Sequence, residues 1–89
     1  MNKALSAKEM IFWDLSQIEY CVDFELSFEF PDQKMAEIAR RATEYLEQRK
    51  NRGEIKGCDL TWVDEGLVIT FRADDGEECK FTVTYSSLA

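Results

Sequence analysis

The stretch IEYCVDFELSFEF, from Ile18 to Phe30, decides the predicted fold. Every even position in it is apolar, and every odd position is polar or small. Because successive side chains of a β-strand point to opposite faces of the sheet, this strict alternation predicts one long strand. One face of the strand is expected to lie on the core. The other is expected to meet water and to carry the carboxylates Glu19, Asp23, Glu25 and Glu29.

A helix is predicted directly after this strand, from Pro31 to about Asn51. Proline suits a first helical turn, and an acidic residue such as Asp32 favours the amino end of a helix. Basic residues gather near the carboxyl end, where Gly53 supplies the left-handed residue that commonly closes a helix. One apolar stripe recurs at helical spacing, formed by Met35, Ile38, Ala39, Ala42, Tyr45 and Leu46.

Three short strands are predicted after Gly57, because the apolar residues return there to a period of two. Two turn sequences, Asp64-Glu65-Gly66 and Asp74-Asp75-Gly76, separate these strands. Such acid-glycine turns join neighbouring antiparallel strands. The carboxyl-terminal third of the chain is therefore predicted to be a three-stranded antiparallel meander.

The amino-terminal region is predicted to form a short helix from about Ala7 to Leu15. Ser6 and Glu9 have the spacing of a capping box, in which each side chain satisfies a free backbone amide of the helix start. Phe12 and Trp13 extend the apolar character onto a second face. Two predictions therefore remain for residues 9–13: a helix, or a short strand that forms a hairpin with the long strand.

Together these elements predict an α+β fold, a two-layer sandwich in the order α-β-α-β-β-β. Its sheet would have four mostly antiparallel strands, with the helices packed on one face and the long strand at an edge. Residues 1–89 are expected to form a single small globular domain with frayed ends at 1–5 and 86–89.

Charge and hydropathy narrow the classes of function. The chain has 89 residues, 45% of them hydrophobic, and a net charge of −7. Residues 34–56 carry a net +3, and the rest carries −10. The overall negative charge disfavours attachment to nucleic acid or to anionic lipid and favours a basic protein partner. We expect no membrane span and no secretion signal, because no stretch has the required apolar length and residues 1–6 lack the required pattern.

The three cysteines predict free thiols and a reducing, cytoplasmic location, because their number is odd and none lies in a Cys-x-x-Cys pair. Cys58 and Cys79 are in phase with apolar neighbours and are expected in the core. Cys21 falls on the wet face of the long strand.

The absence of histidine makes an enzyme an improbable interpretation. Without histidine the chain lacks the usual general base, the Ser or Cys triads built on it, and most zinc sites. The acidic pairs Asp64-Glu65 and Asp74-Asp75 precede glycines, where turn chemistry explains them. We predict no catalytic residue, no metal site and no cofactor.

These observations predict a small acidic cytoplasmic interaction module that acts by surface complementarity. The sharper hypothesis is an inhibitor, immunity or phage-type antagonist protein that covers a basic site on its target. An alternative is a structural or regulatory homodimer, formed through the long edge strand or a helix face. A third hypothesis is a small-ligand pocket between the sheet and the first helix, lined by Phe12, Trp13 and Tyr45. The expected partner contacts are the eight carboxylates Glu19, Asp23, Glu25, Glu29, Asp64, Glu65, Asp74 and Asp75.

Overall fold

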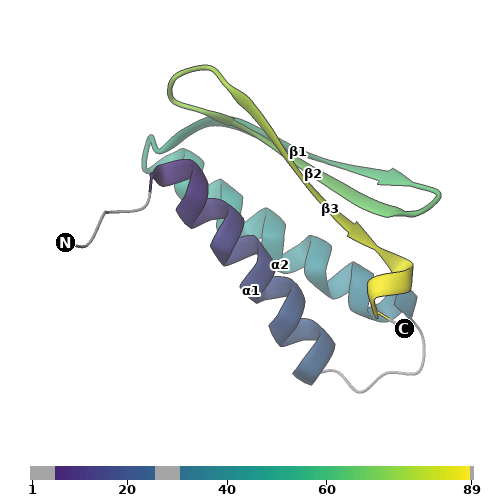
Figure 1. Ribbon diagram of the computed structural model, residues 1–89. Helices are drawn as coiled ribbons and strands as arrows, with labels where there is room; N and C mark the ends of the chain where they lie inside the picture. Colours follow the sequence, from purple (N-terminus) through teal and green to yellow (C-terminus); the bar gives the residue numbers. More distant parts are fainter. Residues whose placement is uncertain (1–5, 26–30, 89) are drawn as a thin grey trace.

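The fold consists of two long helices followed by a three-stranded sheet, as seen in a computed structural model that describes residues 6–25 and 31–88 (Figure 1). A short 3-10 helix closes the described part of the chain. The elements are α1 (Ala7–Glu25), α2 (Pro31–Asn51), β1 (Ile55–Val63), β2 (Gly66–Ala73), β3 (Glu78–Thr84) and η1 (Tyr85–Leu88).

The predicted long strand is wrong. Ile18–Glu25 continues the amino-terminal helix, so α1 is a single helix of 19 residues and does not end near Leu15. Residues 26–30 lie outside the described residues. The alternation misled because residues two apart on a helix point about 200° apart. Apolar residues at every second position therefore also describe a helix with two opposite apolar faces. The alternative of a strand over residues 9–13 is wrong for the same reason.

The helix predicted from Pro31 to Asn51 is confirmed as α2. It ends in a Schellman motif, in which the Gly53 amide donates to the Lys50 carbonyl at 2.9 Å and the Glu54 amide donates to the Arg49 carbonyl at 3.0 Å. Gly53 has the φ of +77° that this motif requires. The glycine after the basic residues was therefore a reliable stop signal.

The described strands form an antiparallel sheet in the order β1-β2-β3, which confirms the meander. The predicted four-stranded sheet in the order α-β-α-β-β-β is wrong. Most of the segment predicted as the long strand, Ile18 to Phe30, belongs to α1 instead. At the first turn, Gly66 has a φ of +154°, and a Cβ atom there would lie 2.1 Å from the carbonyl oxygen of Val83. The acid-glycine turn thus needs its glycine for close backbone approach.

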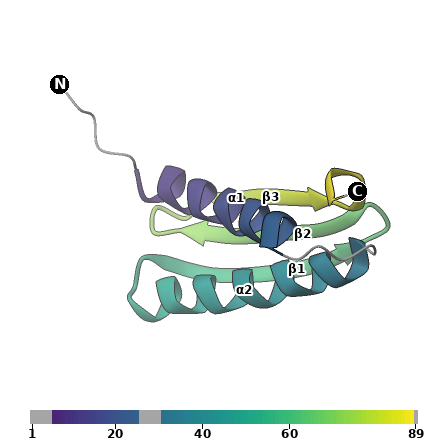
Figure 2. The ribbon, with the colours of Figure 1, turned by 90° about the horizontal axis from the view of Figure 1, so that it is seen from below.

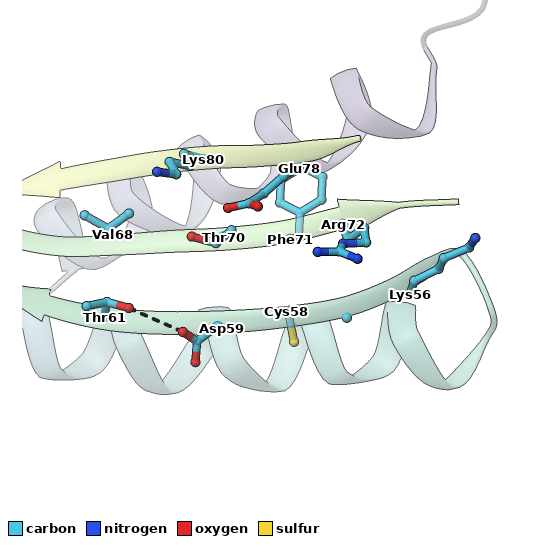
Figure 3. Close-up of a pocket in the computed structure, with 11 residues that line it drawn as sticks. Lys56, Cys58, Asp59, Thr61, Val68, Thr70, Phe71, Arg72, Glu78 and Lys80 are labelled. Atoms are coloured by element: carbon cyan, nitrogen blue, oxygen red, sulfur yellow. Dashed lines mark hydrogen bonds between the residues drawn. The ribbon is translucent and has the colours of Figure 1, made fainter. Parts of the chain in front are cut away.

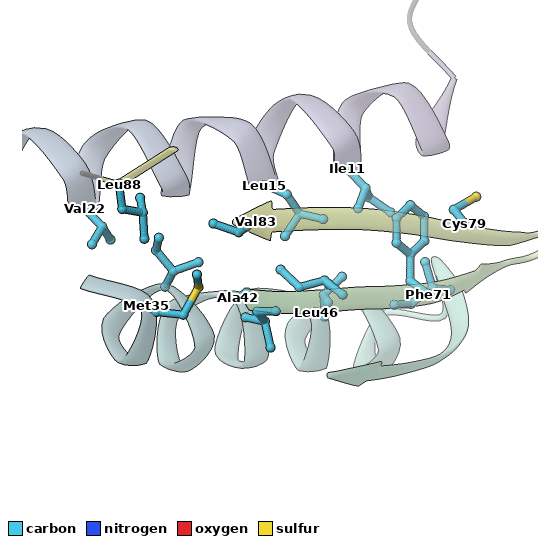
Figure 4. Packing of buried hydrophobic residues seen from close by; sticks show 14 residues of the cluster. Ile11, Leu15, Val22, Met35, Ala42, Leu46, Phe71, Cys79, Val83 and Leu88 are labelled. Carbon is cyan, nitrogen blue, oxygen red and sulfur yellow. The ribbon is translucent and has the colours of Figure 1, made fainter. Parts of the chain in front are cut away.

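Both helices pack on the same face of the sheet, and they run antiparallel to one another beneath it (Figures 1 and 2). α1 lies on the β3 side, and α2 lies on the β1 side (Figure 2). One apolar core fills the space between the layers (Figure 4). Its fully buried members include Leu15 and Val22 from α1, Met35, Ile38 and Leu46 from α2, Leu67, Ile69, Phe71 and Val83 from the sheet, and Leu88.

The expected fraying can be compared with the structure only at residues 86–88, which the structure describes. Residues 1–5 and 89 lie outside the described residues. Tyr85–Leu88, in contrast, forms η1, and Leu88 is buried in the core. The Tyr85 amide also donates to the Glu65 carbonyl at 2.9 Å, so the segment after β3 is tied to the turn between β1 and β2.

Candidate interaction surface

The outward side of α1 carries four large apolar side chains that the core does not cover. Met10 is 50% exposed, Trp13 60%, Tyr20 64% and Phe24 78%. They follow one another at spacings of three, seven and four residues, so they lie on one face of the helix. The buried residues Ile11, Leu15 and Val22 lie about half a turn away. We call Met10, Trp13, Tyr20 and Phe24 the outer stripe.

Two rings of the outer stripe pack against each other. The rings of Tyr20 and Phe24 stack one turn apart, with centroids 6.2 Å apart and an angle of 11° between their planes. This stacking favours one relative arrangement of the two rings, which would reduce the entropy that binding costs.

The start of α1 is fixed by the predicted capping box. The Ser6 amide donates to the Glu9 carboxylate and the Glu9 amide donates to the Ser6 hydroxyl, each at 3.2 Å. These hydrogen bonds hold the pKa of Glu9 below its usual value. The helix therefore begins one turn before the outer stripe, which is presented on regular helix.

Polar contacts along both flanks of α1 fix its rotation about its own axis. Asp14 accepts a hydrogen bond from the Tyr45 hydroxyl at 2.5 Å. Further along, the ammonium of Lys34 lies 2.6 Å from the Asp23 carboxylate. At opposite ends of the helix, Glu25 pairs with Arg41 on α2, and Lys8 pairs with Asp75 and Glu77 in the turn after β2. Because these contacts hold the flanks inward, the outer stripe faces solvent.

The eight predicted contact carboxylates do not form one surface. Glu19, Asp23 and Glu25 lie on α1 and not on a strand, and each contacts a polar partner: Ser87, Lys34 and Arg41 respectively. Glu29 lies outside the described residues. The remaining four lie in two turns at opposite ends of the sheet, Asp64 and Glu65 after β1, and Asp74 and Asp75 after β2 (Figure 1).

The predicted small-ligand pocket is not formed by Phe12, Trp13 and Tyr45. The Phe12 ring packs against Phe71 with a centroid separation of 5.4 Å, so it belongs to the core. Trp13 points to solvent, and Tyr45 is engaged with Asp14. A concave surface of about 630 Å³ lies instead on the outer face of the sheet (Figure 3). Its charged lining residues are Lys56, Asp59, Arg72, Glu78 and Lys80.

The described part of the chain offers no group of three or more metal-ligating side chains. Cys79 is buried, and Cys58 and Cys21 are half-buried; all three are free thiols. Burial raises the pKa of Cys58 and of Cys79, so these thiols are poor nucleophiles. None of the described helices is long and apolar enough to cross a membrane.

Sequence reasoning missed the outer stripe as a surface. The strand interpretation placed Tyr20 and Phe24 on the core-facing side. The available signal was the heptad-like spacing of positions 10, 13, 17, 20 and 24, of which all but Gln17 are large and apolar. Comparison of the chain with protein-family models, curated proteins and solved structures finds no match.

Proposed function

We propose that this protein is a protein-binding module whose outer stripe on α1 packs against a basic amphipathic helix of its partner. The observation that carries the proposal is the row of four large, exposed apolar side chains on one regular helix face. Aromatic residues and Met are enriched in protein interfaces and in their energetic hot spots. A row at three- and four-residue spacing matches the ridges that a second helix presents.

The charge of α1 supports a basic partner. Residues 7–25 contain five carboxylates and one lysine. Glu9 and Asp23 lie along one flank of the outer stripe, and Asp14 and Glu25 lie along the other. Asp23 and Glu25 are paired with Lys34 and Arg41, whereas Glu9 and Asp14, one on each flank, take part in no described ion pair. A partner helix with lysine or arginine beside its apolar stripe would meet Glu9 and Asp14 at the rim of the interface, where charge increases the association rate and specificity.

A second copy of the chain is a weaker candidate for this surface. Pairing two outer stripes would bring two strongly acidic helices together, which costs free energy at low ionic strength. The salt dependence of binding therefore distinguishes a basic partner from a second copy of the chain. Added salt should weaken the binding of a basic partner and should strengthen self-association.

The proposed module fits an inhibitor or antagonist that covers a basic site on its target, acting in the cytoplasm where three free thiols stay reduced. This activity requires no catalytic residue and no cofactor.

The test uses a synthetic amphipathic helix with a leucine stripe and lysine flanks, and a matched control peptide with glutamate flanks. In a Trp62→Phe variant, Trp13 remains as the single tryptophan and reports on the outer stripe, since the chain has two. We expect the lysine peptide to shift the Trp13 emission to shorter wavelength and to bind at least about tenfold more tightly than the glutamate peptide at low salt. Equal affinities would contradict the charge assignment. Sedimentation of a dimer that strengthens with salt would instead assign the stripe to a second copy.

A further inference from the structure

The side of β1 that faces away from β2 is a free sheet edge. β1 pairs with β2 along its length, and no described strand lies on its other side (Figure 3). A free edge carries unpaired amide and carbonyl groups, which proteins either cover or use to bind another strand. Residues 58–63 contain no proline and no bulge that would block pairing.

The helix layer is wider than the sheet that it covers. Two packed helices span roughly 20 Å, because helices pack 8–10 Å apart and each is about 10 Å wide. Three strands at a spacing of about 4.8 Å span roughly 14 Å, and a fourth would bring the sheet to about 19 Å. The excess lies at β1, where α2 runs along and beyond the edge of the strand (Figure 2). The fold thus leaves room for one more strand above α2.

The inward side chains of β1 are incompletely covered. Cys58, Leu60 and Trp62 share the core-facing side with their partners on β2, which are Phe71, Ile69 and Leu67. The β2 partners are fully buried, whereas Cys58 and Leu60 are half-buried and Trp62 is 53% exposed. Apolar side chains from a neighbouring strand would complete this row.

The outward side chains of β1 carry charges without ionic partners among the described residues. A register shift between Ile55 and Gly57 places both Lys56 and Gly57 opposite Arg72, so the Lys56 side chain joins the outer face. Asp59 follows on the same face and accepts a hydrogen bond from the Thr61 hydroxyl at 3.3 Å. Neither Lys56 nor Asp59 takes part in a described ion pair.

We propose that the β1 edge binds an extended segment of a partner protein as an additional strand. Its inward residues are apolar and cover Cys58, Leu60 and Trp62. Its outward residues are an acid beside Lys56, a base beside Asp59 and a hydroxyl beside Thr61. This binding site is separate from the outer stripe of α1 and does not depend on the proposed function.

β3 of a second copy carries this pattern, since Glu78, Lys80 and Thr82 alternate with apolar residues and β3 runs parallel to β1. β3 of a second copy is nevertheless excluded as the occupant by the helices that it carries. α1 packs against β3, so each added copy would bring two helices about 20 Å wide into a sheet repeat of only about 14 Å. A segment without helices beneath it fits the available width.

The test peptide is the β3 pattern without cysteine, Glu-Val-Lys-Phe-Thr-Val, capped at both ends. In a Trp13→Phe variant, Trp62 is the remaining tryptophan and reports on the β1 edge. We expect saturable binding in the millimolar range, with a shift of the Trp62 emission to shorter wavelength and slower amide exchange in β1. The charge-swapped peptide Lys-Val-Glu-Phe-Thr-Val should bind about tenfold more weakly, because two cross-strand attractions become repulsions.

Two controls complete the experiment. The double variant Lys56→Glu with Asp59→Lys changes exposed side chains and should reverse the preference between the two peptides. Alternate amides of a bound strand point toward β1 and away from it. Two peptides, each N-methylated on one of these two sets of amides, should therefore differ: methylation of the set that faces β1 should abolish binding, and methylation of the other set should not. Equal affinity of the two peptides, or no change in β1 exchange at saturating peptide, would overturn the proposal. If amide exchange in β1 slows as the protein concentration rises, without any peptide, a second copy of the chain occupies the edge and the choice of a partner segment is overturned.

Discussion

The two helices are nearly equal in length and share one core, yet they differ on the side that faces away from it. α1 has 19 residues and α2 has 21. The outward side of α2 is charged, and Arg40 there pairs with both Glu37 and Glu44. The outward side of α1 carries the outer stripe. Packing accounts for one apolar face on each helix, so the second apolar face of α1 is surplus to the core and available for binding.

The same difference explains why one helix was predicted and the other was not. On α2 a single apolar stripe stands out against polar residues at the helical period. On α1 the inner residues Ile18 and Val22 alternate with the outer residues Tyr20 and Phe24. The two faces together imitate the period of a strand. Strict alternation therefore identifies a strand only when a second apolar face on a helix is excluded.

The largest expected effect contrasts the inner and outer faces of α1. Leu15 is 1% exposed in the core, so Leu15→Ala should lower the free energy of unfolding by about 2–5 kcal/mol. Tyr20 is mostly solvated, so Tyr20→Ala should change it by less than about 0.5 kcal/mol. Urea unfolding of both variants measures the difference. Similar losses in the two variants would mean that the outer stripe also stabilises the fold.

A smaller effect concerns the ion pair that joins the helices. The Lys34 side chain is 11% exposed and that of Asp23 is 42% exposed. Asp23→Asn leaves the buried ammonium without its counter-charge and should cost about 1–3 kcal/mol. Lys34→Met removes the charge but keeps the buried chain, and should cost less than about 1 kcal/mol. The reverse order of stability in thermal unfolding would show that Asp23 matters through something other than this pair.

The smallest effect concerns the hydrogen bond between Tyr45 on α2 and Asp14 on α1. Tyr45→Phe should cost about 0.5–1.5 kcal/mol at neutral pH. Burial, with the Asp14 carboxylate adding to it, raises the pKa of Tyr45 above its ordinary value of 10.0. The folded state therefore keeps this proton where the unfolded state loses it, so the contribution is full below pH 10 and declines above it.

The free energy of unfolding is measured at pH 9 and at pH 11, about one unit either side of that value. Its decrease from pH 9 to pH 11 should be smaller in Tyr45→Phe than in the unaltered protein. Parallel slopes in the two proteins would show that Tyr45 titrates alike when folded and unfolded.

The parts of the fold that the sequence predicted are those with a single local cause. The capping box at Ser6 and Glu9, the stop at Gly53 and the acid-glycine turns each depend on a few adjacent residues. The outer stripe could not be found in this way. Its residues are of the same apolar types as core residues, and only the tertiary structure decides which face of the helix is covered. The predicted contact carboxylates on α1 do not line a strand face, and Ser87, Lys34 and Arg41 contact them, which no local pattern reveals. Their role in binding a partner stays a prediction.

The most direct test of the account compares stability and binding in one variant that carries Trp13→Gln and Phe24→Gln. If the outer stripe serves binding and not folding, the free energy of unfolding should stay within about 1 kcal/mol of the unaltered protein. In the same variant, the affinity for the lysine-flanked helix, measured by calorimetry, should fall at least about tenfold. A loss of several kcal/mol of stability together with unchanged affinity would contradict the account.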